Sequence, residues 1–131
     1  MCNQSEWIVR EAFLAYARGD VARMMEFVDP DVEWIYLRPD PDDPDRACRG
    51  RRELEQALLL QASRGLQPEV EEVVASGEKV MLVMRTPSPD QHSERLTNGR
   101  TYDVVTVKDG LIVCLRACHD RLAARSLIGI G

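Results

Sequence analysis

The stretch TYDVVTVKDGLIVCLRACHD, residues 101–120, decides the fold of this chain. It consists of two apolar runs, residues 102–107 and 111–117, joined by Lys-Asp-Gly at residues 108–110. Asp-Gly supplies the positive φ angles that a tight turn requires, and β-branched residues are frequent in both runs. The stretch therefore predicts a β-hairpin.

Outward from the hairpin, helical patterns come first and most strand patterns come later. Three segments with apolar residues every three or four positions are predicted helices: residues 5–18, 21–27 and 51–62. Three further runs are predicted strands: residues 32–37, 69–75 and 79–86. Asp20 is placed to cap the second helix. Residues 38–45, RPDPDDPD, predict an irregular loop or lid, and the tail after residue 120 begins with a helical pattern.

Length and composition favour one domain, residues 1–131. A chain of 131 residues with 44% hydrophobic content is long enough to bury roughly two-thirds of its unfolded surface. A net charge of −5 and an aromatic content of 5% argue against nucleic-acid binding, because an acidic surface repels phosphate and few rings are available for stacking.

No run in the sequence has the length of a membrane span, and the N-terminus lacks a basic region followed by an apolar core. We therefore expect a cytoplasmic protein that does not bind membranes. The four cysteines, Cys2, Cys48, Cys114 and Cys118, are expected to be reduced thiols. Their spacing fits neither a disulfide framework nor a metal site, and we expect no metal and no cofactor.

This order of elements predicts an α+β fold with a curved antiparallel sheet wrapped over helices. It also resembles the SnoaL-like branch of the nuclear transport factor 2 superfamily, which includes ketosteroid isomerase, limonene epoxide hydrolase and polyketide cyclases. Three segments carry the resemblance: FLAYARGDVARMMEFVDPDVEW at residues 13–34, RGRRELEQAL at residues 49–58 and KDGLIVCLRACHD at residues 108–120. The resemblance implies a cystatin-like fold with a cone-shaped pocket between helices and sheet.

Alternation along the hairpin divides its side chains between two faces. One face of the first strand carries Thr101, Asp103 and Val105, and one face of the second carries Leu115, Ala117 and His119. The resemblance implies that these faces line the pocket. The outer face then carries Thr106, Cys114, Arg116 and Cys118. We expect that no helix covers this face and that the protein forms a homodimer through it.

Asp103 matches the aspartic acid that ketosteroid isomerase keeps protonated as a hydrogen-bond donor. Burial disfavours a carboxylate and raises its pKa, which explains how such an acid donates at neutral pH. The alternative is an aspartate without function, either paired with Arg100 or Arg85 or simply near a strand end.

His119 is the leading acid–base candidate, because histidine titrates near neutral pH. If the hairpin loop has three residues, Asp103 lies opposite Leu115, and His119 lies about 13 Å farther along the strand. The two side chains then flank a ligand without touching. A solvated imidazole without function is the alternative, and His92, in a polar connection, is expected at the surface.

Three aromatic residues, Tyr16, Trp34 and Tyr36, are candidates for lining the pocket, and each also fits a plain core position. The resemblance places Tyr36 at the catalytic base of the isomerase. A phenol with a pKa near 10 is a poor base at pH 7, so the usual proton shuttle is missing.

The resemblance to the epoxide hydrolase is incomplete. Arg85 matches its arginine, but Pro87 and Ala117 stand where that enzyme has two acids, so epoxide hydrolysis is disfavoured. Arg85 remains a candidate for binding a polar ligand group or for a surface ion pair. Asp120 is expected to act as a structural cap or in a salt bridge.

Two kinds of function therefore remain open. One is a cofactor-independent isomerase, cyclase or dehydratase that binds a small apolar molecule, with Asp103 as donor and His119 as acid–base and with Leu115 and Ala117 lining the pocket. The other is a non-catalytic member of the superfamily that binds a small ligand or another protein.

Overall fold

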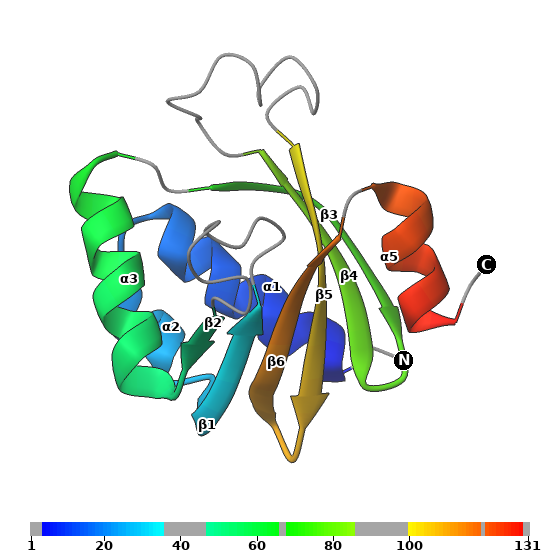
Figure 1. Ribbon diagram of the computed structural model, residues 1–131, viewed down its shortest axis with the longest axis horizontal. Coiled ribbons are helices and arrows are strands. Elements are labelled where there is room, and N and C mark those ends of the chain that lie inside the picture. Colours follow the sequence, from blue (N-terminus) through cyan, green and yellow to red (C-terminus); the bar gives the residue numbers. More distant parts are fainter. Residues whose placement is uncertain (1–3, 36–46, 66–67, 86–99, 119, 130–131) are drawn as a thin grey trace.

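The computed structural model describes residues 4–35, 47–65, 68–85, 100–118 and 120–129 (Figure 1). Its helices are α1 (Gln4–Ala17), α2 (Val21–Met25), α3 (Arg51–Ser63) and α5 (Arg121–Ile128). Its strands are β1 (Val28–Ile35), β2 (Ala47–Arg49), β3 (Glu69–Ser76), β4 (Lys79–Arg85), β5 (Arg100–Lys108) and β6 (Leu111–Cys118). No helix in these ranges is both long enough and apolar enough to cross a membrane.

The six strands form one curved sheet in the order β2-β1-β6-β5-β4-β3 (Figure 1). Neighbouring strands are antiparallel except β1 and β6, which run parallel. Helices α1, α2 and α3 pack on one face, which we call the inner face, and α5 packs on the other, the outer face. The predicted α+β class is confirmed, with one parallel pair that the sequence did not indicate.

The main core lies between the inner face and helices α1, α2 and α3. Alternating residues of the strands point into it: Val80, Leu82, Met84, Val105, Val107, Ile112 and Leu115. Phe13 of α1 meets Trp34 of β1, and their rings stack with centroids 5.9 Å apart. The predicted helical period of the N-terminal segment is confirmed, because Ile8, Val9, Ala12 and Phe13 of α1 are all buried.

Two aspartates, Asp20 and Asp120, are helix N-caps, as the sequence indicated. The Asp20 carboxylate accepts a hydrogen bond from the backbone N–H of Arg23 at 3.0 Å and caps α2. The Asp120 carboxylate accepts one from the N–H of Ala123 at 2.8 Å and caps α5, so the cap expected at Asp120 is confirmed. Each bond satisfies an N–H that has no partner within the helix.

The predicted hairpin is present, but its predicted register is wrong. Only Asp109 and Gly110 form the loop, with φ of 53° and 80°, and Lys108 lies opposite Leu111. Val113 is an extra residue in β6, because Val107 pairs with Ile112 while Thr106 pairs with Cys114. This bulge shifts the remaining pairs by one residue. The shorter loop moves the partner of Asp103 by one residue and the bulge moves it by another, so Asp103 lies opposite Ala117 rather than Leu115.

Strands β1 and β2 also differ from the predicted strands. The strand expected at residues 32–37 begins earlier, at Val28, and contains an irregularity between Val28 and Glu33 where Asp29 accepts a hydrogen bond from the N–H of Asp31. Strand β2 was not predicted, because three residues are too few for a periodic pattern. Residues 36–46, with the expected loop or lid, lie outside the described residues.

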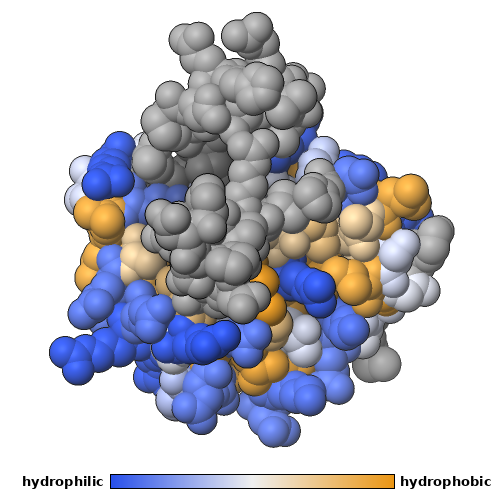
Figure 2. Space-filling view, in the orientation of Figure 1, coloured by the Kyte–Doolittle hydropathy of each residue, from blue (hydrophilic) through white to orange (hydrophobic). Residues whose placement is uncertain are grey.

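The expectation that no helix covers the outer face is wrong. Helix α5 packs against it in a second cluster of buried residues: Met81, Val83, Val104, Cys118, Ala124 and Ile128. Thr106, Cys114 and Arg116 are not in this cluster. On the side shown in Figure 2, hydrophobic residues form separate patches among hydrophilic ones.

Candidate functional site

Asp103 lies on the inner face of β5, between Leu82 of β4 and Ala117 of β6. Val105, two residues later on the same strand, is in the helix-facing core, as is Leu115, its partner on β6. The predicted alternation is therefore confirmed for the two central strands. Only 5% of the Asp103 surface is exposed, and Asp103 and Ser5 are the only buried polar residues in the described ranges.

Burial raises the pKa of Asp103 from 3.8 to about 7, because the carboxylate loses its hydration. The Thr101 hydroxyl acts in the opposite direction by favouring the carboxylate. This opposing effect is smaller than that of burial. Thr101 Oγ1 itself makes no hydrogen bond of acceptable geometry to any described residue. Asp103 takes part in none of the ion pairs of the described residues. A neutral carboxyl group with a proton to donate is therefore a major form of Asp103 near pH 7.

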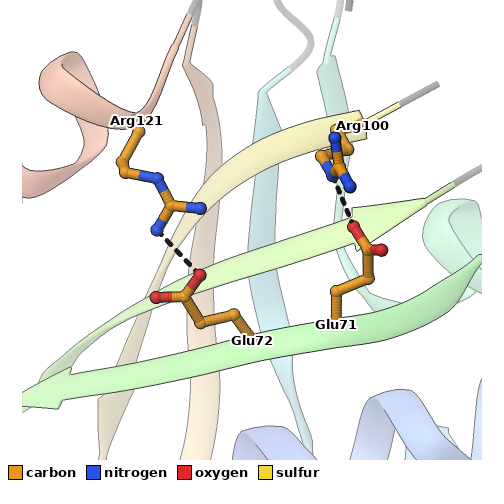
Figure 3. Close-up of polar contacts among 4 residues, drawn as sticks. All are labelled: Glu71, Glu72, Arg100 and Arg121. Atoms are coloured by element: carbon orange, nitrogen blue, oxygen red, sulfur yellow. Dashed lines mark hydrogen bonds and ion pairs between the residues drawn. The ribbon is translucent and has the colours of Figure 1, made fainter. Parts of the chain in front are cut away.

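The two arginines that the sequence offered as partners for Asp103 do not pair with it. Arg100 Nε lies 2.8 Å from Glu71 Oε1, and Arg121 at the start of α5 pairs in the same way with Glu72 (Figure 3). Arg85 is exposed, and the alternation of β4 places it on the outer face with Met81 and Val83. Arg85 therefore does not join Asp103, Leu115 and Ala117 on the inner face.

Tyr16 is a buried residue of α1 whose hydroxyl is engaged within the protein. It donates a hydrogen bond to Gln61 Oε1 of α3 at 2.5 Å and also lies 3.4 Å from the carbonyl oxygen of Leu58. Burial raises its pKa to about 12, so it does not act as a base at neutral pH. Of the two alternatives for Tyr16, this geometry favours a core position that ties α1 to α3.

Trp34 also occupies a core position. It is 7% exposed, stacks on Phe13, and lies between Cys48 of β2 and Leu115 of β6 in the sheet. Of the two alternatives for Trp34, this packing favours the core. The residues beside Asp103 on the inner face, Leu82, Val105 and Ala117, are also apolar, which explains the desolvation of its carboxyl group.

Several candidate residues lie outside the described residues, namely Tyr36, Pro87, His92 and His119. The separation of about 13 Å expected between Asp103 and His119 assumed that Asp103 faces Leu115. Because Asp103 faces Ala117 instead, a separation of about 13 Å no longer follows from the pairing. In the described ranges no group of three or more histidine, cysteine or acidic side chains is arranged to hold a metal ion.

Sequence reasoning placed Thr101 on the inner face but gave it no role. Its hydroxyl oxygen is buried without a hydrogen-bond partner in the described residues. The signal was available in the sequence, since a threonine two residues before a buried aspartate on one strand shares its face. Gln61, which accepts the hydrogen bond of the Tyr16 hydroxyl, is half-buried.

The profile of the SnoaL-like domain family matches residues 9–115. The chain belongs to this family, a branch of the nuclear transport factor 2-like superfamily. No curated protein sequence matches the chain.

Solved structures of low sequence identity share the fold. A candidate polyketide cyclase from Sinorhizobium meliloti is 18% identical, with a TM-score of 0.66, over 85% of this chain and 93% of the other. A candidate ketosteroid isomerase from Kribbella flavida is 17% identical, with a TM-score of 0.63, over 87% and 76%. A cystatin-like fold protein from Xanthomonas campestris is 20% identical, with a TM-score of 0.66, over 95% and 98%. These similarities confirm the cystatin-like α+β fold.

The buried Asp103 predicts a specific dependence of stability on pH. The pKa of Asp103 is about 7 in the folded state and 3.8 for an exposed aspartate, so the folded state binds the proton more tightly than the unfolded state does. The proton on Asp103 therefore stabilises the folded state. This contribution to the free energy of unfolding is fully present below about pH 4 and is lost as the pH rises to about 7, a decrease of at most about 4 kcal/mol. In Asp103→Asn this titration is absent. Urea unfolding of both proteins between about pH 4.5 and 7.5 measures the difference, and parallel pH dependences would contradict a raised pKa.

Proposed function

We propose that the protein binds a small, mainly apolar molecule between the helices and the inner face of the sheet, with Asp103 as a neutral hydrogen-bond donor to a ligand oxygen. The observation that carries this proposal is the burial of an acidic side chain among apolar residues without an ion pair. Such a carboxyl group is costly unless it has a partner, and a ligand oxygen is a suitable one.

In the catalytic form of the proposal, the protein is a cofactor-independent isomerase, cyclase or dehydratase. His119 would remove a proton next to a ligand carbonyl group, and Asp103 would donate a hydrogen bond to the enolate oxygen that develops. Membership of the SnoaL-like family supports this form, as do similar structures described as a candidate polyketide cyclase and a candidate ketosteroid isomerase. Leu115 and Ala117 are proposed to line the same site.

The second candidate is a non-catalytic protein with the same ligand site or with a protein partner. Ala117, the neighbour of Asp103 across the sheet, has no polar group, and the sequence has Tyr36 and Pro87 where related enzymes have catalytic groups. Pro87 and Ala117 also disfavour epoxide hydrolysis, because they stand where the related hydrolase has the two acids that activate a water.

We further propose that residues 1–131 form one domain of a cytoplasmic homodimer. Helix α5 already covers the part of the outer face around Val104, so the interface is proposed to include Thr106, Cys114 and Arg116. Thr106 and Cys114 pair across β5 and β6, and both are partly exposed. A second copy would remove this central strip of the sheet from water.

Substitutions at Asp103 test the donor role. We expect Asp103→Asn to retain ligand affinity, because an amide still donates, and Asp103→Leu to lose roughly 1 to 3 kcal/mol, because a ligand oxygen is left unpaired. A suitable probe is 2-naphthol, a neutral phenol with a flat apolar body, titrated by fluorescence at about pH 6. Mass spectrometry of a co-purified molecule would identify the natural ligand. Equal affinities of wild type and Asp103→Leu would contradict the donor role.

His119 distinguishes the two forms of the proposal. A β,γ-unsaturated cyclic ketone tests proton transfer, since its conversion to the conjugated isomer is visible by ultraviolet absorption. We expect His119→Ala to abolish this conversion while 2-naphthol affinity stays nearly unchanged, with His92→Ala as the matched control. If wild type binds 2-naphthol but converts no ketone, the non-catalytic form is favoured.

The dimer is tested separately by light scattering. We expect twice the mass of the chain at micromolar concentration, and Thr106→Arg should give a folded monomer, because it places a charge in the proposed interface. Lys108→Glu, on an exposed residue at the hairpin end, serves as the control. A monomeric wild type would rule the dimer out.

A further inference from the structure

The Thr101 hydroxyl is one of two buried side-chain polar atoms without a hydrogen-bond partner in the described residues, the other being Arg51 Nε. An unpaired buried hydroxyl costs free energy, and most such groups in proteins find a partner. Thr101 is therefore a position where a partner is missing. It differs from Arg51 in lying on the same strand as Asp103, two residues away.

Thr101 and Asp103 are neighbours on the inner face of β5. Residues i and i+2 of a strand point to the same side, with backbones about 7 Å apart. Across the sheet on β4, Thr101 faces Met84 and Asp103 faces Leu82, both buried and apolar. Two polar groups thus lie together in apolar surroundings, each able to donate a hydrogen bond.

We infer that Thr101 is a second ligand-binding residue, and that its hydroxyl and the Asp103 carboxyl group together hold one oxygen atom of a neutral ligand such as a ketone, phenol or alcohol. A single oxygen placed between two donors accepts from both, at about 2.7–3.0 Å from each. This inference rests on the ligand site proposed above and adds a specificity-determining residue to it.

The surroundings favour a neutral oxygen over a carboxylate. A buried anion needs a cationic partner. The inner-face residues of the three strands around the pair include no lysine or arginine: Val80, Leu82, Met84, Thr101, Asp103, Val105, Val107, Ile112, Leu115 and Ala117. When Asp103 ionises at higher pH, it would also repel an anionic ligand.

Two substitutions isolate the Thr101 hydroxyl. Thr101→Val replaces the hydroxyl by a methyl group, and Thr101→Ser keeps it. We expect Thr101→Val to bind 2-naphthol about 3- to 10-fold more weakly than wild type at about pH 6, and Thr101→Ser to bind it nearly as well. Naphthalene, which has the same ring body without oxygen, should bind equally well to all three proteins.

A ligand-free measurement separates binding from structure. Because the hydroxyl has no partner in the described residues, Thr101→Val should unfold at the same urea concentration as wild type or a higher one. A lower midpoint would show that the hydroxyl is bonded within the protein and would overturn the inference.

The remaining outcomes distinguish this inference from the function on which it rests. If Asp103→Leu weakens 2-naphthol binding and Thr101→Val does not, the role of Thr101 is overturned and the Asp103 donor stands. If wild type binds neither 2-naphthol nor naphthalene, the proposed ligand site is overturned, and the Thr101 inference with it.

Discussion

The candidate site depends on the strand register that holds the Asp103 carboxyl group inside an apolar sheet surface. The pairing of β5 with β4 and β6 places Asp103 between Leu82 and Ala117, on the face that the helices cover. Water is excluded there, so the cost of ionisation is high and the proton is retained up to about pH 7. The same pairing places the Thr101 hydroxyl beside it. A one-residue slip of β5 would turn both groups to the outer face.

The outer-face contacts help to fix this register. Helix α5, begun by the Asp120 cap, packs Ala124 and Ile128 against Val104, which alternates with Asp103 on β5. The Arg121–Glu72 pair joins the start of α5 to β3 (Figure 3). Such exposed ion pairs contribute little stability individually, so the apolar contact is the main restraint. Burial of Val104 on one side thus supports burial of Asp103 on the other.

Much of the fold was predictable from local patterns. Asp109-Gly110 marked the hairpin, alternation assigned Val105 and Leu115 to the inner face, and the 3.6-residue period identified α1. Half of the register error came from expecting a loop of three residues where two form it. The other half was not predictable, because the bulge at Val113 inserts one residue without altering the run of apolar side chains. The packing of α5 on the outer face depends on contacts between distant segments, and these are not visible in a local pattern.

The site was less predictable than the fold. Alternation placed Asp103 correctly, but sequence could not decide whether Tyr16 and Trp34 belong to the core or to a ligand site, since both roles need an aromatic residue on the inner side. The Tyr16–Gln61 hydrogen bond favours the core position for Tyr16. The resemblance to the epoxide hydrolase likewise made Arg85 a candidate for ligand binding, but the alternation of β4 places Arg85 on the outer face.

The protonation state of Asp103 is measured by following the ¹³C chemical shift of its carboxyl carbon by NMR as a function of pH. Assignment by comparison with Asp103→Asn identifies the resonance. We expect a transition near pH 7, well above the pKa of 3.8 of an exposed aspartate. A transition close to pH 4 would show that the carboxyl group is hydrated or paired, and would contradict its role as a neutral donor.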